Sequence, residues 1–135
     1  MDLTSDFLSA AKALLGDKGW RMDAESLEDV STPWRGTYQG HTPFLALPAS
    51  TADVAALVKL CHAHKVAITP QGGNTGLVDA GTPHGEIVLS LRRMQNVRAI
   101  DPFNNSLTIE AGAPLVIAQD AADQADRLFP LSLGS

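Results

Sequence analysis

The sequence has little of three features that would each point to a class of protein. Its only cysteine is Cys61, so it forms no intramolecular disulfide and offers no cysteine-based metal site. Its 10 basic residues form no run longer than a pair, and 15 acidic residues bring the net charge to −5. This excludes the basic surface that nucleic-acid binding needs.

The sequence also lacks a long apolar run. Every such run is far shorter than the roughly 20 residues of a membrane-spanning helix, so we expect no membrane span. The first residues, Met1 to Thr4, lack the cationic start of a secretory signal, and we therefore expect a cytoplasmic location. What is present is a chain of 135 residues, 44% of them hydrophobic, which suffices for one globular domain.

The first segment predicts a short amphipathic helix over residues 6–15. Its apolar residues recur at helical spacing, Thr4 or Ser5 can cap its start, and Gly16 can end it. Residues 17–41 show no such pattern and predict a long irregular connection, of the kind that is often functional or packed over a neighbour.

The middle of the chain predicts a strand–helix–strand unit. Residues 44–47 are apolar and bounded by prolines, which favours a strand at a sheet edge. Residues 51–64 follow a capping sequence with helical spacing, and residues 66–69 form a second apolar run. Strands joined by a helical crossover run parallel, so we expect a βαβ unit.

The last third predicts a different arrangement. Residues 87–89 indicate a third buried strand, whereas residues 97–100 and 107–110 flank turn-forming residues and predict a β-hairpin. Residues 113–127 predict an alanine-rich helix with Pro114 at its start. Parallel strands followed by a hairpin indicate an α+β fold and not a doubly wound sheet.

A glycine-rich stretch directly after the second predicted strand carries the chemistry. It contains Gly72, Gly73 and Gly76, where the backbone can take positive φ and approach a ligand closely. Successive backbone N–H groups in such turns bind anions, and Asn74 and Thr75 add donors for phosphate oxygens. The spacing is neither a nucleoside-triphosphate P-loop, which needs a lysine, nor the Gly-x-Gly-x-x-Gly fingerprint. A pyrophosphate cradle and a tight connection without ligand both remain open on spacing alone.

Here the residues resemble a family. The stretch Pro70-Gln71-Gly72-Gly73-Asn74-Thr75-Gly76-Leu77 resembles the FAD pyrophosphate loop of vanillyl-alcohol oxidase/para-cresol methylhydroxylase flavoproteins, in particular the D-2-hydroxyacid dehydrogenases that act on D-lactate, D-2-hydroxyglutarate or glycolate. Four further segments match in order: Leu47–Val54, Ile87–Leu91 with Met94, Leu107–Ala113 and Pro130–Ser135. The resemblance implies an α+β, PCMH-type FAD-binding fold with a three-stranded parallel βαβ subdomain, followed by the start of an antiparallel subdomain.

The resemblance also implies a set of cofactor contacts. The predicted FAD-binding residues are Pro70, Gln71, Gly72, Gly73, Asn74, Thr75, Gly76 and Leu77, with Gly134 and Ser135 as part of a second flavin loop. Some relatives carry a histidine where Asn74 lies, and that histidine bonds covalently to the flavin. Because asparagine offers no such nucleophile, we expect FAD to bind non-covalently. No catalytic residue and no metal ligand is predicted in this chain.

The function implied is oxidation of a D-2-hydroxy acid by hydride transfer to FAD. We expect residues 1–41 to form the helix and connection, and residues 42–135 the N-terminal part of an FAD-binding domain that is truncated here and has no cap domain. The chain alone should then be inactive and bind FAD weakly or not at all, because half a cradle leaves the flavin unburied. The alternative is a non-catalytic truncated module that folds and self-associates through its truncated edge.

Other chemistry-bearing residues have ordinary interpretations. His62 and His64 point about 200° apart on a helix, which favours a solvated helix end over a metal site. Cys61 lies on the apolar helix face, so we expect a buried thiol. His84 is expected to be an ordinary surface histidine, and the alternative is that it lies near the cofactor loop. Arg92-Arg93 indicates a solvated pair at a turn, with an anionic ligand as the alternative, and Trp34-Arg35 indicates packing.

Overall fold

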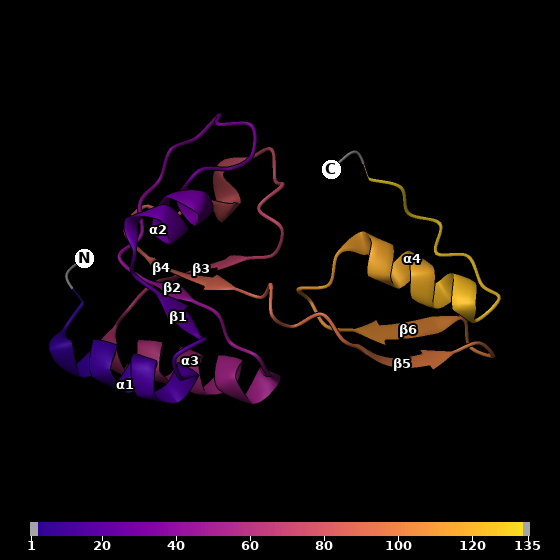
Figure 1. The fold of residues 1–135 in the computed structure, drawn as a ribbon, viewed down its shortest axis with the longest axis horizontal. Coiled ribbons are helices and arrows are strands. Elements are labelled where there is room, and N and C mark those ends of the chain that lie inside the picture. Colours follow the sequence, from indigo (N-terminus) through magenta and orange to yellow (C-terminus); the bar gives the residue numbers. More distant parts are fainter. Residues whose placement is uncertain (1–2, 134–135) are drawn as a thin grey trace.

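The computed structural model describes residues 3–133. Its elements follow in the order α1 (Ser5–Leu15), β1 (Trp20–Arg21), α2 (Ala24–Ser31), β2 (Leu45–Ala46), α3 (Thr51–His64), β3 (Ile68–Gln71), the 3-10 helix η1 (Asp79–Gly81), β4 (Ile87–Ser90), β5 (Val97–Asp101), β6 (Ser106–Ile109) and α4 (Leu115–Gln124). They form two units that lie side by side (Figure 1). The sheet unit comprises α1 to β4, and the hairpin unit comprises β5, β6 and α4.

The sheet unit is built on four strands in the order β1-β2-β4-β3. Strands β2, β4 and β3 run parallel, as the predicted βαβ unit requires, and β1 pairs antiparallel with β2. Helices α1 and α3 cover one face of the sheet and α2 covers the other (Figure 1). The expectation that residues 44–47 form an edge strand is wrong, because β1 adds a strand outside β2.

The first and third helices form where the sequence predicts them. Thr4 Oγ1 accepts a hydrogen bond from the Phe7 N–H at the start of α1, and Gly16, with φ 66°, ends that helix. Ser50 Oγ accepts from the Asp53 N–H at the start of α3. These side-chain acceptors satisfy N–H groups that have no partner within the helix.

Residues 17–41 correct the prediction of a purely irregular connection. They contain the two-residue strand β1 and the eight-residue helix α2, whose N-cap Asp23 accepts from the Ser26 N–H at 2.9 Å. A strand of two residues shows no alternation, and α2 contributes only Leu27 and Val30 as large apolar residues, so neither gives a periodic signal. Strand β3, predicted over residues 66–69, also begins two residues later than predicted. It contains Pro70, which is tolerated because β3 lies at an edge of the sheet.

Two buried clusters hold the sheet unit together. The larger, between the sheet and helices α1 and α3, consists of Phe7, Ala11, Phe44, Ala46, Leu57, Cys61, Ile87 and Leu89. The smaller consists of Val30, Leu45, Leu47 and Val88, beneath α2. Alternate residues of β2 and β4 therefore face opposite layers, and every residue of β4 is buried. The burial of Cys61 confirms the predicted buried thiol.

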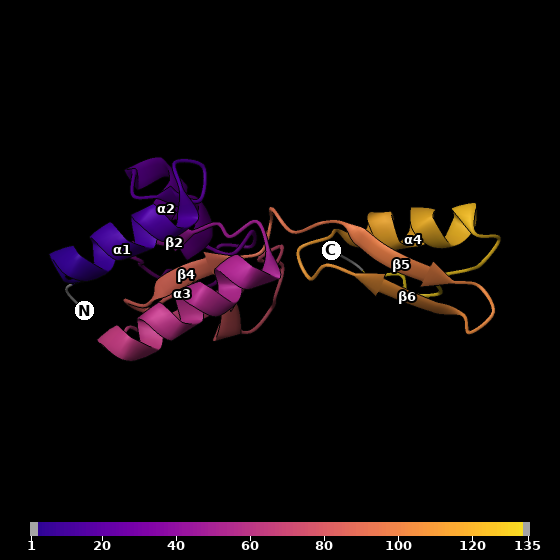
Figure 2. The ribbon, with the colours of Figure 1, turned by 90° about the horizontal axis from the view of Figure 1, so that it is seen from below.

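The hairpin unit confirms the prediction for the last third of the chain. Strands β5 and β6 pair antiparallel around a turn in which Asp101 Oδ1 accepts from the N–H groups of Phe103 and Asn104. Helix α4 packs on one face of this ribbon and is shorter than predicted, with Pro114 as its N-cap (Figures 1 and 2). None of the helices within residues 3–133 has the length and apolar character of a membrane span.

The two units meet at a close backbone contact. The Gly112 N–H donates to the Met94 carbonyl at 2.9 Å, and a Cβ atom at Gly112 would lie 1.7 Å from the Leu91 carbonyl oxygen. Beside it, the buried Glu110 carboxylate accepts from the Asn96 N–H at 2.9 Å and pairs with Arg98 at 3.1 Å. Only glycine fits at residue 112, so this contact sets how the hairpin unit lies against the sheet unit.

Candidate functional site

The glycine stretch forms an exposed loop between the end of β3 and η1. The positive φ that glycine permits is not used here: none of Gly72, Gly73 and Gly76 takes it, whereas Asn74 has a φ of 54°. The glycines instead leave the backbone bare. A Cβ atom at Gly72 would meet nothing within 4 Å, and one at Gly73 would meet only the Thr75 methyl group, at 3.6 Å. The loop therefore presents its main chain to a ligand without side-chain interference.

The backbone N–H groups of this loop are available to a ligand. Among residues 3–133, no backbone carbonyl accepts from the N–H groups of residues 72–76. Because an N–H group away from water needs a partner, a run of free donors is suited to an anion with several oxygen atoms. The loop thus retains the donor set that the sequence predicts for a pyrophosphate.

Two cavities border the loop, and Gly72, Gly73 and Arg92 line both of them. The central cavity, of about 390 Å³, lies between the loop and the segment that leads into α4. Besides Gly72 and Gly73, it is lined by Thr75, Arg92, Gln95, residues 111–115 and Leu133. The α2 cavity, of about 290 Å³, lies between the loop and the end of α2; its lining includes Asp29, Thr32, Trp34, Gln71, Asn74 and Arg92. A third hollow, of about 260 Å³, has Pro70 and Gly76 in its lining.

The central cavity is positive although the chain as a whole is acidic. Arg92 is the only charged side chain among its lining residues in the described chain, and no carboxylate lines it. The first turn of α4 also lines it, through Pro114 and Leu115, and the N-terminal end of a helix carries partial positive charge. Bare backbone donors, a helix start and one guanidinium together favour an anionic ligand.

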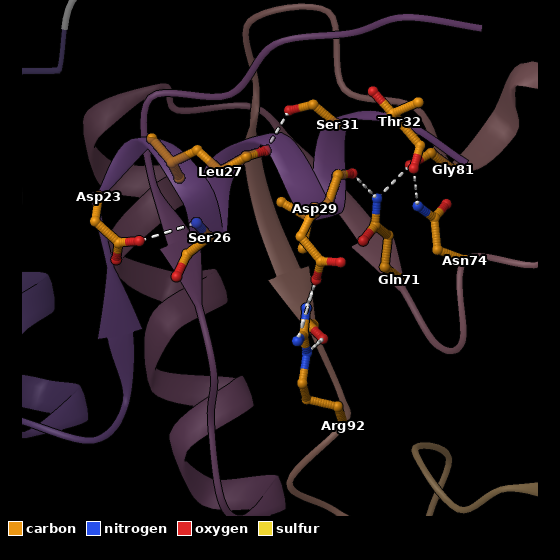
Figure 3. Close-up of polar contacts among 12 residues, drawn as sticks. Asp23, Ser26, Leu27, Asp29, Ser31, Thr32, Gln71, Asn74, Gly81 and Arg92 are labelled. Carbon is orange, nitrogen blue, oxygen red and sulfur yellow. Dashed lines mark hydrogen bonds and ion pairs between the residues drawn. The ribbon is translucent and has the colours of Figure 1, made fainter. Parts of the chain in front are cut away.

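Gln71 holds the loop in place. Its side chain is buried, and its Nε2 donates to the carbonyl oxygens of Val30 at 2.7 Å and Gly81 at 2.6 Å (Figure 3). Gln71 thus ties the last residue of β3 to both α2 and η1. The sequence places Gln71 among the cofactor contacts, and in the structure both donors of its amide nitrogen are engaged by the protein, so its side chain positions the loop.

Asn74 gives the loop a second anchor. Its Nδ2 donates to the Thr32 carbonyl oxygen at 3.3 Å, just beyond α2, while its backbone takes the left-handed conformation that asparagine tolerates (Figure 3). Helix α2 thus contacts the loop through both Gln71 and Asn74. Helix α2 has no periodic signal in the sequence, although it supports the site.

The far end of the loop is fixed by ionisable groups. His84 Nε2 lies 2.9 Å from Asp79 Oδ2, and this hydrogen bond is the main cause that lowers the pKa of Asp79. The backbone N–H of His84 donates to Glu86, which lowers the pKa of that carboxyl. His84 is exposed and lies close to the loop, as the alternative interpretation had it, and its described contacts are structural.

Three residues border the site although the sequence does not assign them to it: it favours a solvated pair for Arg92-Arg93 and packing for Trp34, and it does not single out Asp29. Arg92 lines both cavities, and its partner Asp29 lines the α2 cavity, where Trp34 is 59% exposed. Asp29 and Trp34 come from residues 17–41, which the sequence assigned only to a connection. For Asp29 and Trp34, the available signal was the general expectation that such a connection is functional or packed over a neighbour. For Arg92, it was the ligand role that is the alternative to a solvated pair.

The remaining predicted residues are dispersed. Leu77 is 60% exposed and lines neither cavity, while Gly134 and Ser135 lie outside the described residues. His62 and His64 lie on α3, where the His64 ring makes an edge contact with Phe7. Within residues 3–133, no three histidine, cysteine, aspartate or glutamate side chains come together as a metal site.

Comparison with known proteins gives consistent matches. Residues 42–135 match the family described as "FAD binding domain". The chain is 40% identical over 112 residues to the D-2-hydroxyglutarate–pyruvate transhydrogenase of Saccharomyces cerevisiae, covering 82% of the chain and 23% of the yeast protein. It is 33% identical over 134 residues to the mitochondrial D-2-hydroxyglutarate dehydrogenase of Arabidopsis thaliana, covering 98% of the chain and 24% of that protein. The chain spans about a quarter of the length of these relatives.

Solved structures share the fold. Alkyldihydroxyacetonephosphate synthase superposes with a TM-score of 0.81 at 21% identity, covering 91% of this chain and 25% of that one. Substrate-bound p-cresol methylhydroxylase superposes with a TM-score of 0.72 at 22% identity, covering 92% of this chain and 26% of that one. These matches confirm the α+β, PCMH-type fold that the resemblance implies.

Proposed function

The chain belongs to the FAD binding domain family of PCMH-type flavoproteins and resembles the D-2-hydroxyglutarate dehydrogenases, and on that premise we propose that it binds the FAD diphosphate in an enzyme that oxidises D-2-hydroxy acids. The observation that supports this most directly is the loop of residues 72–76, with its unpaired backbone donors and bare glycine surfaces within the described chain.

The geometry of the site suits this cofactor. A diphosphate needs several donors on a surface that lets its oxygen atoms approach closely, and the loop offers both. The space at Gly72 is open, so no side chain has to move before a diphosphate contacts the backbone. The central cavity has no carboxylate among its described lining residues that would repel the ligand. The residues present therefore fit the diphosphate part of FAD.

The division of work in the proposed enzyme follows from these contacts. Bound FAD would supply the redox chemistry, as the acceptor for the hydride on the α-carbon of the hydroxy acid. The backbone of residues 72–76 binds and orients the diphosphate, and Gln71 and Asn74 hold that backbone against α2. Asn74 offers no nucleophile for the flavin, so we propose non-covalent binding. No residue of this chain is assigned to substrate, which relatives are expected to bind through a later cap domain.

The chain alone should bind FAD weakly and turn over no substrate. The central cavity, of about 390 Å³, holds only part of a molecule as large as FAD, and affinity for small molecules depends on enclosing most of the ligand. A second candidate function is a module that self-associates without turnover. It is supported by the exposure of apolar residues in and next to the hairpin unit, such as Ile100 and Leu128.

A titration followed by NMR tests the proposed diphosphate site. With ¹⁵N-labelled chain and FAD, we expect the amide signals of residues 72–76 to shift. The Gly72→Asp variant should lose those shifts because its carboxylate repels the diphosphate, whereas Gly72→Ala should keep the fold, since its methyl group meets open space. Shifts confined to other residues, or equal shifts in G72D, would contradict the proposed site.

Three further results would bear on the proposal. Flavin should leave the denatured protein, and retention of flavin after denaturation would contradict non-covalent binding. Tight, stoichiometric FAD on this chain would contradict the prediction of weak binding. Reduction of bound flavin by D-lactate, D-2-hydroxyglutarate or glycolate would contradict the prediction that the chain alone is inactive.

A further inference from the structure

The ion pair between Arg92 and Asp29 is loose and exposed. Arg92 Nη2 lies 3.4 Å and Nη1 3.5 Å from the same oxygen, Asp29 Oδ2, so the guanidinium fork uses one carboxylate oxygen only (Figure 3). The two side chains are 47% and 67% exposed. Surface ion pairs of this kind contribute little to stability, and a better acceptor can replace the carboxylate at small cost.

The position of Arg92 places it between the two cavities. It follows β4 by two residues and lines both the central cavity and the α2 cavity, and Gly72 and Gly73 line both as well. Of these two cavities, Asp29 lines the α2 cavity and not the central one. The guanidinium therefore borders a cavity that has no carboxylate among its described lining residues, while its present partner Asp29 lines the α2 cavity.

We propose that Arg92 binds the diphosphate held by the glycine loop and that it exchanges Asp29 for that ligand. The inference rests on the proposed function, because it assigns a side chain to the same diphosphate. A guanidinium donates two parallel hydrogen bonds to phosphate oxygens, and such charge-assisted bonds are stronger than neutral ones. Asp29 holds the side chain near the loop until the ligand arrives.

A third contact limits the movement that this exchange needs. Arg92 Nε donates to Ser90 Oγ at 3.1 Å, and Ser90 is a buried residue of β4. The side chain is thus held at its Nε, and only its two terminal nitrogen atoms have to change partners. Holding the group close to its bound position lowers the entropy that binding has to overcome.

Arg93 provides the matched comparison. It has the same charge and is next to Arg92 in the sequence, yet its Nη1 donates to the Leu47 carbonyl at 2.8 Å, and it lines neither the central nor the α2 cavity. A general effect of positive charge would involve both residues alike. The proposed exchange involves Arg92 only.

Binding of inorganic pyrophosphate in magnesium-free buffer tests the inference without any enzymatic activity. Dissociation constants come from the amide shifts of residues 72–76, for the unmodified chain, Arg92→Gln, Arg93→Gln and Asp29→Asn. We expect R92Q to weaken binding about tenfold, R93Q to change it by less than about twofold, and D29N to strengthen it about twofold, since the competing carboxylate is gone. Added salt should weaken pyrophosphate binding by R92Q less than it weakens binding by the unmodified chain.

The outcomes separate the inference from the proposed function. If pyrophosphate shifts no signal of residues 72–76 in the unmodified chain, both are wrong. If pyrophosphate binds but R92Q binds it as tightly as the unmodified chain does, or R93Q weakens binding as much as R92Q, the inference alone is wrong.

Glutarate, a dicarboxylate, is the control for the ligand, and it should leave the signals of residues 72–76 unchanged. Shifts equal to those from pyrophosphate would mean that Arg92 binds a carboxylate, and they would contradict the inference. If R92Q does not fold, Arg92→Lys keeps the charge without the fork and should bind with intermediate affinity.

Discussion

The sheet unit and the hairpin unit of this chain differ in how much of their apolar surface they bury. All four residues of β4 are buried, whereas four of the five residues of β5 are exposed. Helix α4 covers one face of the β5–β6 ribbon, and no described element covers the other (Figure 1). Exposed apolar side chains of the hairpin unit include Val97, Ile100, Phe103, Val116, Leu128 and Leu131.

The difference follows from how many layers each unit has. The sheet unit has helices on both faces, so its strands are buried from two sides. A two-stranded hairpin on its own is only marginally stable in water, and helix α4 covers just one face of the β5–β6 ribbon. The hairpin unit therefore depends on the close contact of Gly112 with Leu91 and Met94, which follow β4. The glycine loop follows β3 of the sheet unit, and the segment into α4 lines the central cavity opposite it.

The largest effect is expected from Phe44→Ala in the sheet unit. Phe44 is fully buried and stacks on Trp20 with ring centroids 6.3 Å apart. Removal of a buried aromatic ring costs about 3–5 kcal/mol of unfolding free energy. Val97→Ala in the hairpin unit, at a residue 38% exposed, should cost less than about 1 kcal/mol. Urea denaturation followed by circular dichroism measures both, and equal losses would contradict the contrast between the units.

Gly112→Ala should have the next largest effect, at the contact between the units. Its methyl group would lie 1.7 Å from the Leu91 carbonyl oxygen, so the backbone has to move. We expect a loss at the upper end of the about 1–3 kcal/mol that overpacking costs. Hydrogen exchange should increase in β5, β6 and α4, with little change in β4. Gly72→Ala is the matched control, because the same added methyl group meets open space.

Acid should weaken the hairpin unit through Glu110. The hydrogen bond from the Asn96 N–H, followed by the one from Arg98, lowers the pKa of Glu110 below its usual value of 4.5. A lowered pKa in the folded chain means that this carboxylate contributes stability above pH 4.5 and loses that contribution as the pH falls through its folded value. Glu110→Gln should make β5–β6 hydrogen exchange less sensitive to pH below 4.5, whereas Glu25→Gln, at an exposed position in α2, should not.

The smallest effect concerns the reactivity of a single thiol. Burial raises the pKa of Cys61 to about 11, and the side chain lies in the core beneath α3. At pH 8 we expect a thiol reagent to label Cys61 only when the sheet unit opens. A Cys61→Ala, Ser106→Cys variant places the thiol at an exposed position of β6 and should react at once. Fast labelling of Cys61 in the folded chain would contradict a closed sheet unit.

Most of the fold could be predicted from local patterns. Helices α1 and α3 have both helical spacing and capping residues, and the hairpin has turn formers between two apolar runs. Each of these signals comes from residues that are close together in the sequence. Strand β1 and helix α2 could not be predicted, because each is stabilised by contacts with β2 and the sheet more than by its own pattern. Because β1 was not predicted, β2 was predicted at the edge of the sheet, whereas it is an internal strand.

The candidate site divides in the same way. The loop of residues 70–77 could be found because glycine there has a local reason, the need for a bare backbone. Arg92 and Asp29 could not be linked, because they lie 63 positions apart and meet only when α2 packs on the sheet. The role of Gln71 was missed for a similar reason, since its two acceptors come from α2 and η1.

The sequence by itself determined the family, the glycine loop and the α+β order of elements, because backbone conformation and hydrophobic periodicity depend on residues close together in the chain. The tertiary structure decided which residues surround that loop. Strand order brought β4 and Arg92 beside β3, and the close approach at Gly112 placed the start of α4 opposite the loop. These neighbours depend on packing between distant segments, which no local pattern records.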